Sequence, residues 1–244
     1  MDYTVKLVIE YDGSPFAGWQ LQPDAVTVQG KLEQALRSLT GENIRITGAG
    51  RTDAGVHALG QVASFQCSRH LPMKAYKDGL NTFLPSTIRI IGAESVDDIF
   101  NARYSAKGRS YRYVLSKRDR AIGSQYAWCP DFSYKLKPMK KASRFLIGKH
   151  CFLSFCRKGR EKGEFVSRVT SVKWKELSEE IHFEISAERF FHNMVRIILG
   201  TLLEVGRGRF SVRDFRDILV SENRKNAGPT IPPNGLYLLK VDYN

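Results

Sequence analysis

The chain has 244 residues, enough for one large domain or two of ordinary size. It carries 38 Lys and Arg against 25 Asp and Glu, and this formal net charge of +13 attracts polyanions such as nucleic acids. No apolar run approaches the ~20 residues that span a bilayer, and the start, MDYTVKLVIEYDG, alternates polar and apolar residues unlike a signal peptide. We therefore expect a cytoplasmic protein with no membrane partner.

In chain order, the first half predicts a β-α-β-β-α-β arrangement. Val5, Leu7 and Ile9 alternate with polar residues in a strand that DGSP ends. Further periodic segments predict a helix at 28–39 capped by Thr27, strands at 43–47 and 61–66, a helix at 73–82 and a strand at 87–96.

The second half repeats this order without obvious sequence identity. The pattern predicts a strand at 110–116, a helix at 137–148, a hairpin of 165–177 and 180–190, helices at 191–206 and 211–221, and a strand at 235–243. We expect an α+β fold of two ferredoxin-like βαββαβ halves, residues 1–105 and 106–244, whose antiparallel sheets flank a central cleft that takes the ligand.

The cysteines do not predict a metal site. Cys67, Cys129, Cys151 and Cys156 form no C-x-x-C pair, and no second ligand pair follows His150 and Cys151 at usable spacing. We expect reduced thiols.

The segment GAGRTDAG at 48–55 fails both common phosphate-binding patterns. In the dinucleotide pattern G-x-G-x-x-G, Asp53 stands at the third glycine, where a carboxylate would repel a pyrophosphate. In the P-loop pattern, Val56 and His57 stand where Lys and Ser or Thr are needed. A nucleotide hydrolase is therefore disfavoured.

Two interpretations of Asp53 remain from the local sequence. Asp53 is either the cap of a helix that begins near Ala54, or an ionised carboxylate on a loop of small residues that a bulky partner can approach. In the second interpretation Arg51, two residues away, projects to the same side if the segment is extended.

Basic and aromatic residues alternate in RYSAKGRSYRYVLSKRDR at 103–120. Such a stretch can hold phosphates and stack bases, and it also fits a half-exposed strand with a wet basic face. A non-catalytic RNA-binding protein with paired recognition modules is an alternative, although KGRSYRYVL matches the RNP1 pattern only loosely.

Several motifs together resemble the tRNA pseudouridine synthase A family. They are EYDGSPFAGWQLQP (10–23), TVQGKLEQAL (27–36), GAGRTDAGVHALGQVASF (48–65), SYRYVL (110–115), FHNMVRIILGTLLEVG (191–206) and GLYLLKVDY (235–243). They occur in the family's order from end to end of the chain. Two positions depart from the family's pattern: Asn101 replaces a frequent His in FNAR, and Cys151 replaces Asp in HCF.

The resemblance implies isomerisation of uridine to pseudouridine in the anticodon stem-loop of tRNAs, around positions 38 to 40. It also implies the pseudouridine synthase fold with an RNA-binding cleft, a homodimer, no cofactor and no metal. Because a base inside a stem must leave the helix to be reached, the pocket has to hold a flipped nucleotide.

Residue roles follow from the same resemblance. It implies that Asp53 is the catalytic aspartate, that Arg196 in NMVR is its cationic partner, and that the Tyr111 ring stacks on the target base. Arg51 is placed to hold the flipped nucleotide. Tyr113, two residues after Tyr111, is expected to be a core aromatic.

Overall fold

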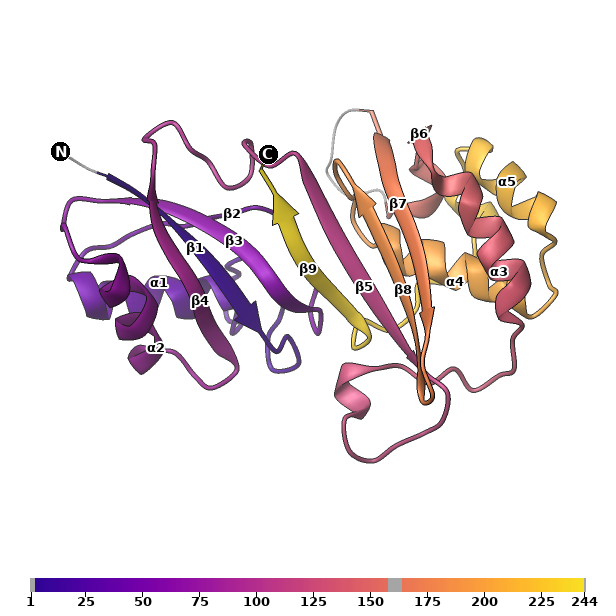
Figure 1. The fold of residues 1–244 in the computed structure, drawn as a ribbon, viewed down its shortest axis with the longest axis horizontal. Helices are drawn as coiled ribbons and strands as arrows, with labels where there is room; N and C mark the ends of the chain where they lie inside the picture. Colours follow the sequence, from indigo (N-terminus) through magenta and orange to yellow (C-terminus); the bar gives the residue numbers. More distant parts are fainter. Residues whose placement is uncertain (1–2, 158–163, 244) are drawn as a thin grey trace. The chain divides into compact units, whose positions relative to one another are not determined.

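The computed structural model describes residues 3–157 and 164–243 of a chain that divides into two compact units (Figure 1). Unit 1 comprises Met1–Lys107 and Tyr237–Asn244, and unit 2 comprises Gly108–Leu236. The C-terminal strand, expected in the second half, therefore packs with unit 1. The α+β class with antiparallel sheets is confirmed.

Unit 1 contains a sheet in the order β4-β1-β3, and both β2 and β9 pair with the remaining edge of β3. All pairs are antiparallel except β3 with β9. The predicted β-α-β-β-α-β order is confirmed here. The elements are β1 (Tyr3–Tyr11), α1 (Val28–Thr40), β2 (Thr47–Gly48), β3 (His57–Cys67), a π-helical turn (Ala75–Gly79), α2 (Leu80–Phe83), β4 (Ile88–Val96) and β9 (Leu236–Asp242).

Helix α1 begins and ends where local chemistry predicts. Thr27 Oγ1 accepts a hydrogen bond from the Gly30 amide at 3.2 Å, which satisfies a first-turn donor. Gly41 follows the last turn with φ 80°, a left-handed conformation that favours glycine. Leu32 and Leu36, one turn apart, are fully buried and share the core of unit 1 with the inward side chains of β1.

Unit 2 contains an antiparallel sheet in the order β5-β8-β7-β6. Its elements are β5 (Gly108–Ser116), α3 (Leu136–Ser143), β6 (Gly148–Cys151), β7 (Val166–Glu176), β8 (Glu180–Ala187), α4 (Met194–Gly206), α5 (Val212–Val220) and four 3₁₀ turns (Ser124–Tyr126, Arg144–Leu146, Leu153–Phe155, Arg224–Asn226).

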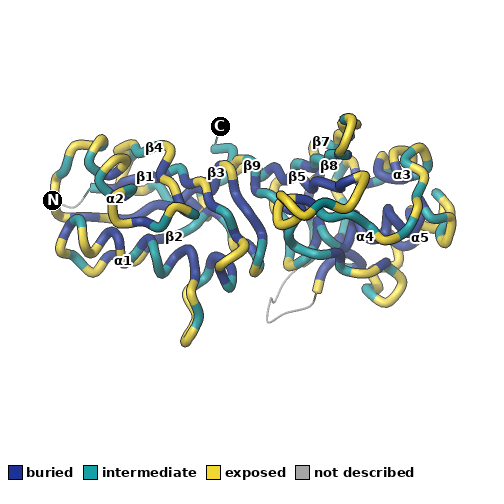
Figure 2. Tube along the Cα trace, turned by 90° about the horizontal axis from the view of Figure 1, so that it is seen from below, coloured by how far each residue is buried: buried dark blue, intermediate teal, exposed yellow. Residues whose placement is uncertain are grey.

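Helix α4 forms the centre of unit 2 and is buried along nearly its whole length (Figure 2). A Cβ on Gly206 would lie 2.8 Å from Met139 Sδ, so glycine allows α3 to approach closely. On the other side of α3, Trp174 Nε1 of β7 donates a hydrogen bond to Ser143 Oγ at 3.0 Å. These contacts join helices and sheet into one core.

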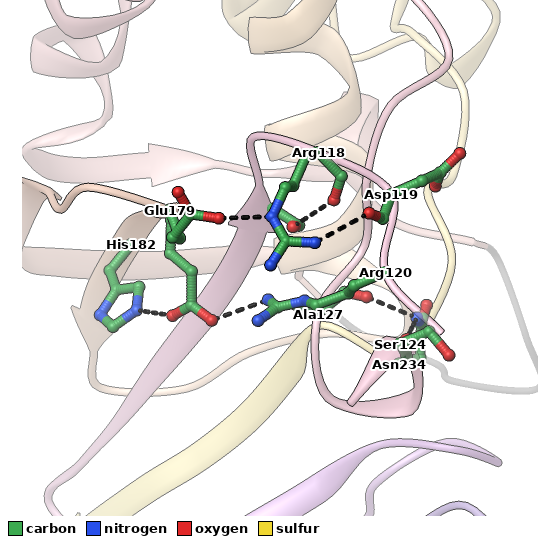
Figure 3. A network of polar contacts seen from close by, with 10 residues as sticks. Arg118, Asp119, Arg120, Ser124, Ala127, Glu179, His182 and Asn234 are labelled. Carbon is green, nitrogen blue, oxygen red and sulfur yellow. Dashed lines mark hydrogen bonds and ion pairs between the residues drawn. The ribbon is translucent and has the colours of Figure 1, made fainter. Parts of the chain in front are cut away.

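A polar network fastens the loop after β5 to the β7–β8 hairpin (Figure 3). Arg118 pairs with Glu179, and Arg120 Nη2 pairs with Glu180 Oε1 at 2.7 Å. Burial opposes ionisation of Glu180, but hydrogen bonds from His182 and Arg120 outweigh it and hold the pKa of Glu180 below its usual value. These ion pairs hold the start of the loop at the turn between β7 and β8.

Two predicted boundaries are wrong. The strand expected at 43–47 is reduced to β2, because the Ile46 amide bonds to Glu33 Oε1 of α1 at 3.2 Å rather than to a strand. The helix expected at 137–148 ends at Ser143, and a 3₁₀ turn leads to Gly148 with φ 111°. There the unpredicted β6 begins. In the described part of the chain, no helix is long and apolar enough to cross a bilayer.

Candidate active site

Asp53 lies in the loop of residues 49–56 that joins β2 to β3. Its side chain is half-buried, and its carbonyl accepts a turn hydrogen bond from the Val56 amide at 3.2 Å. Strand β3 starts at His57, and no helix follows in residues 54–67 as described. The interpretation of Asp53 as a helix cap is therefore wrong.

The segment after β1 anchors the Asp53 loop. The Trp19 amide donates to Thr52 O at 3.0 Å, and Thr52 Oγ1 shares a buried 2.7 Å hydrogen bond with Tyr11 Oη. On the other side of the loop, Gln61 Nε2 of β3 donates to Gly50 O at 2.9 Å. Asp53 thus directly follows a segment, residues 50–52, whose backbone is hydrogen-bonded to neighbouring elements.

The three glycines of GAGRTDAG, Gly48 at the end of β2 and Gly50 and Gly55 in the loop, serve different purposes. A Cβ on Gly48 would lie 2.6 Å from ring atoms of the buried Trp19, so this glycine allows the indole to approach. Gly55 has φ 75° and needs the left-handed conformation. Gly50 has no atom within 4 Å of the Cβ position and no such φ. Neither packing nor backbone conformation within the described residues explains the glycine at 50.

Arg51 is exposed and has no hydrogen bond or ion pair within the described residues. It shares the anchored loop with Asp53, as the sequence predicts. Its guanidinium charge is therefore available to an anionic partner near Asp53.

Tyr111 and Tyr113 lie on β5 and differ in exposure. Tyr113 is fully buried, its hydroxyl donates to Pro232 O at 2.7 Å, and burial raises its pKa far above the usual value, an effect that Arg196 partly opposes. The prediction of a core residue is confirmed for Tyr113. Tyr111 is 8% exposed and packs edge-on against Phe190, with ring centroids 4.9 Å apart.

Arg196 lies in the first turn of α4, and two neutral acceptors help to orient it. Its Nε donates to Ile231 O at 2.7 Å, and its Nη1 donates to Asn193 Oδ1 at 2.9 Å. Asn193 has φ 62°, in the left-handed region that asparagine tolerates. The side chain of Arg196 is half-buried.

The structure thus places Asp53 and Arg51 in one anchored loop of unit 1, and Tyr111 and Arg196 in unit 2. Sequence reasoning missed Thr52, Phe190 and Asn193, which hold these side chains. The sequence did contain a signal for Asn193. An asparagine directly before a helix tolerates the left-handed conformation, and Arg196 follows it in the first turn. Chemically, a fixed carboxylate on a loop of small residues can serve as nucleophile or base toward a bulky substrate.

Comparison with known proteins identifies the family of this chain. A family model described as tRNA pseudouridine synthase matches residues 7–105 and 142–244. A protein named tRNA pseudouridine synthase A from Thermoanaerobacter sp. (strain X514) is 43% identical over 241 residues, which cover 98% of this chain and 99% of that protein. The chain belongs to the tRNA pseudouridine synthase A family. The recognition made from the motifs is confirmed, and the chain is an enzyme of an isomerase family.

Other members of the tRNA pseudouridine synthase A family are similar over the same length. The protein of that name from Clostridium botulinum (strain Alaska E43 / Type E3) is 43% identical and also covers 98% of this chain and 99% of that protein. A solved structure of an archaeal box H/ACA sRNP Nop10–Cbf5 complex is 12% identical, with a TM-score of 0.37, and covers 92% of this chain and 59% of that chain.

The close approach at Gly48 is expected to stabilise the fold. Gly48→Ala should lower the free energy of unfolding by about 1–3 kcal/mol, because the new methyl group would lie 2.6 Å from the Trp19 ring. Urea unfolding followed by tryptophan fluorescence measures the loss. Gly50→Ala is the matched control and should change stability by less than about 1 kcal/mol. Equal losses in the two variants would contradict the packing argument.

Proposed function

We propose that this protein isomerises uridine to pseudouridine in the anticodon stem-loop of tRNAs, around positions 38 to 40. The observation that carries the proposal is the anchored loop on which Asp53 stands, in a chain of this family. The neighbouring Gly50 supports it, because the open space beside this residue lets a large substrate approach.

The reaction is an isomerisation without a net redox change. The C1′–N1 bond of uridine breaks, the uracil turns, and a C1′–C5 bond forms, while C5 loses a proton and N1 gains one. Nothing is oxidised and no phosphate is transferred, so we propose no cofactor, no metal and no ATP. Asp53 supplies the carboxylate, by attack on C6, by attack on C1′, or by taking a proton from the ribose.

The other proposed site residues act on the same nucleotide. Arg196, oriented by Ile231 O and Asn193, supplies the cation that keeps a partly buried carboxylate ionised. Tyr111 stacks on the target base, and its phenol transfers a proton to or from carbon in this proposal. Arg51 holds the flipped nucleotide or fills the space it leaves, because its exposed guanidinium can pair with phosphate.

The proposal also covers the location, the oligomeric state and the RNA partner of the protein. We propose a cytoplasmic homodimer that binds tRNA, and a net charge of +13 supports binding to a polyanion. We also propose that the two halves, 1–105 and 106–244, contribute different parts of the machinery, the catalytic loop from the first and the tyrosine and arginine from the second.

Asp53→Asn should abolish turnover, a loss of more than about 10²-fold, because the amide is neither a base nor a nucleophile of comparable strength. The affinity for tRNA should stay within about tenfold, or ~1.4 kcal/mol. Release of tritium from C5-labelled uridine in tRNA measures turnover without added ATP or metal. Asp98→Asn, at an exposed aspartate of unit 1, is the matched control. Turnover near that of the wild type would refute the assignment.

Arg51→Ala should leave stability within about 0.5 kcal/mol, because the side chain is exposed and has no described partner. Turnover of intact tRNA should fall about tenfold, since base flipping loses a phosphate contact. The comparison is Arg45→Ala, which removes an exposed arginine that is paired with Glu33 on α1. If both variants have wild-type kinetics, Arg51 does not belong to the site.

Tyr111→Phe separates the ring from the hydroxyl. If the phenol transfers a proton, the single-turnover rate should fall by at least about tenfold while the ring still stacks. Tyr113→Phe, which removes the core hydroxyl bonded to Pro232 O, should lower thermal stability without changing that rate. An unchanged rate in Tyr111→Phe would show that only the ring matters.

A further inference from the structure

Unit 2 contains a cavity of about 630 Å³, within the size range of pockets that hold small organic ligands. Its wall combines segments far apart in the sequence: the loop before α3, the end of α4 with residues 207–210, the turn at Arg224, and residues 227–232. The lining includes three arginines and three aromatic residues: Arg207, Arg209, Arg224, Trp128, Phe132 and Phe210.

The wall of the cavity is positively charged. Glu204 of α4 is nearly buried and accepts hydrogen bonds from Arg207 Nη1 at 3.0 Å and Arg209 Nη1 at 3.1 Å. Three guanidinium groups against one carboxylate leave a net charge of +2. Glu204 fixes two of the arginines in place but neutralises only one charge.

Arg224 is bonded to two neutral oxygen atoms, at longer distances than those of Arg207 and Arg209 to Glu204. Its Nη1 lies 3.3 Å from Ala227 O, and its Nη2 lies 3.4 Å from Thr230 Oγ1. Within residues 3–157 and 164–243 it forms no ion pair. Partial burial lowers the pKa of Arg224, although a guanidinium remains charged at neutral pH. A half-buried cation of this kind gains most from an anionic ligand.

The aromatic side of the cavity is held rigidly. The Trp128 amide donates to Val114 O at 3.1 Å, and Trp128 O accepts from the Ser116 amide at 2.8 Å, which fastens this residue to β5. The Phe132 ring lies edge-on to Trp128, with centroids 6.4 Å apart, and carries the Arg207 guanidinium 4.0 Å from its centroid. Fixed aromatic faces beside arginines are the surroundings in which nucleic-acid bases stack.

We propose that this cavity binds one nucleotide of the RNA substrate, its phosphate paired with Arg209 and Arg224 and its base packed against the aromatic side chains. The proposal rests on the proposed function, which supplies an RNA as substrate. Ile231 lines the cavity, and its carbonyl is the acceptor that orients Arg196. The nucleotide therefore binds beside the segment that holds a proposed active-site residue of unit 2.

The test measures the dissociation constant of unmodified tRNA and its dependence on salt concentration, by filter binding. Arg224→Ala and the charge reversal Arg209→Glu should each raise the dissociation constant about tenfold and reduce the salt slope by about one, the value for one lost phosphate contact. Arg213→Ala is the matched control, because this arginine of α5 is 86% exposed and lies outside the cavity.

Trp128→Ala separates stacking from charge. It should weaken tRNA binding several-fold with an unchanged salt slope, and Trp128→Phe should restore most of the affinity. Thermal unfolding of each variant shows that the fold is retained, and Arg209→Glu changes a 61% exposed side chain if Arg224→Ala fails to fold. Dissociation constants within twofold of the Arg213→Ala value in all cavity variants would overturn the proposal.

A second experiment tests whether the cavity binds a free nucleotide or only a nucleotide within an RNA chain. Equilibrium dialysis with labelled uridine monophosphate should show binding that Arg224→Ala abolishes if the cavity recognises the free nucleotide. Binding of tRNA alone, sensitive to the same substitution, supports a site that needs the RNA chain. Wild-type protein that binds tRNA through the cavity but releases no tritium would refute the proposed function and leave the cavity assignment intact.

Discussion

The approach of the Trp19 indole to the backbone of Gly48 is the constraint on which the candidate active site depends. A loop rich in glycine loses much conformational entropy on ordering, so a carboxylate on it is positioned only if other elements hold its backbone. Trp19 does this twice, with its ring against Gly48 and with its amide on Thr52 O. The loop can then leave open space at Gly50 and still hold Asp53 in place, as the proposed role of Asp53 requires.

In unit 2, hydrogen bonds likewise hold arginine side chains in place. Arg196 is oriented by a carbonyl and an amide oxygen, neutral groups that position the guanidinium without removing its charge. In the cavity, Glu204 orients two arginines and leaves a net positive wall. In the cavity, hydrogen bonds set the geometry while a net positive charge stays available to an anion.

The segment 227–232 connects these two parts of unit 2. Ile231 offers its carbonyl to Arg196, and Thr230 offers its hydroxyl to Arg224. A Cβ on Gly200 would lie 2.0 Å from Pro229 O, so the segment lies directly on α4. Because α4 is buried along nearly its whole length, the segment rests on one of the least deformable parts of the protein.

Periodicity and capping were enough to predict β1, α1, the β7–β8 hairpin and α4, because these signals depend on neighbours within a few residues. The bounds of β2 and the existence of β6 were not predictable in this way, since the Ile46 amide bonds to Glu33 and β6 exists through its pairing with β7. The motif resemblance correctly identified the family, and the role of Asp53 stays a prediction. The anchoring of Asp53 by Trp19 and the arginine-lined cavity emerged in the folded chain, because both bring together residues that are distant in sequence and carry no local pattern.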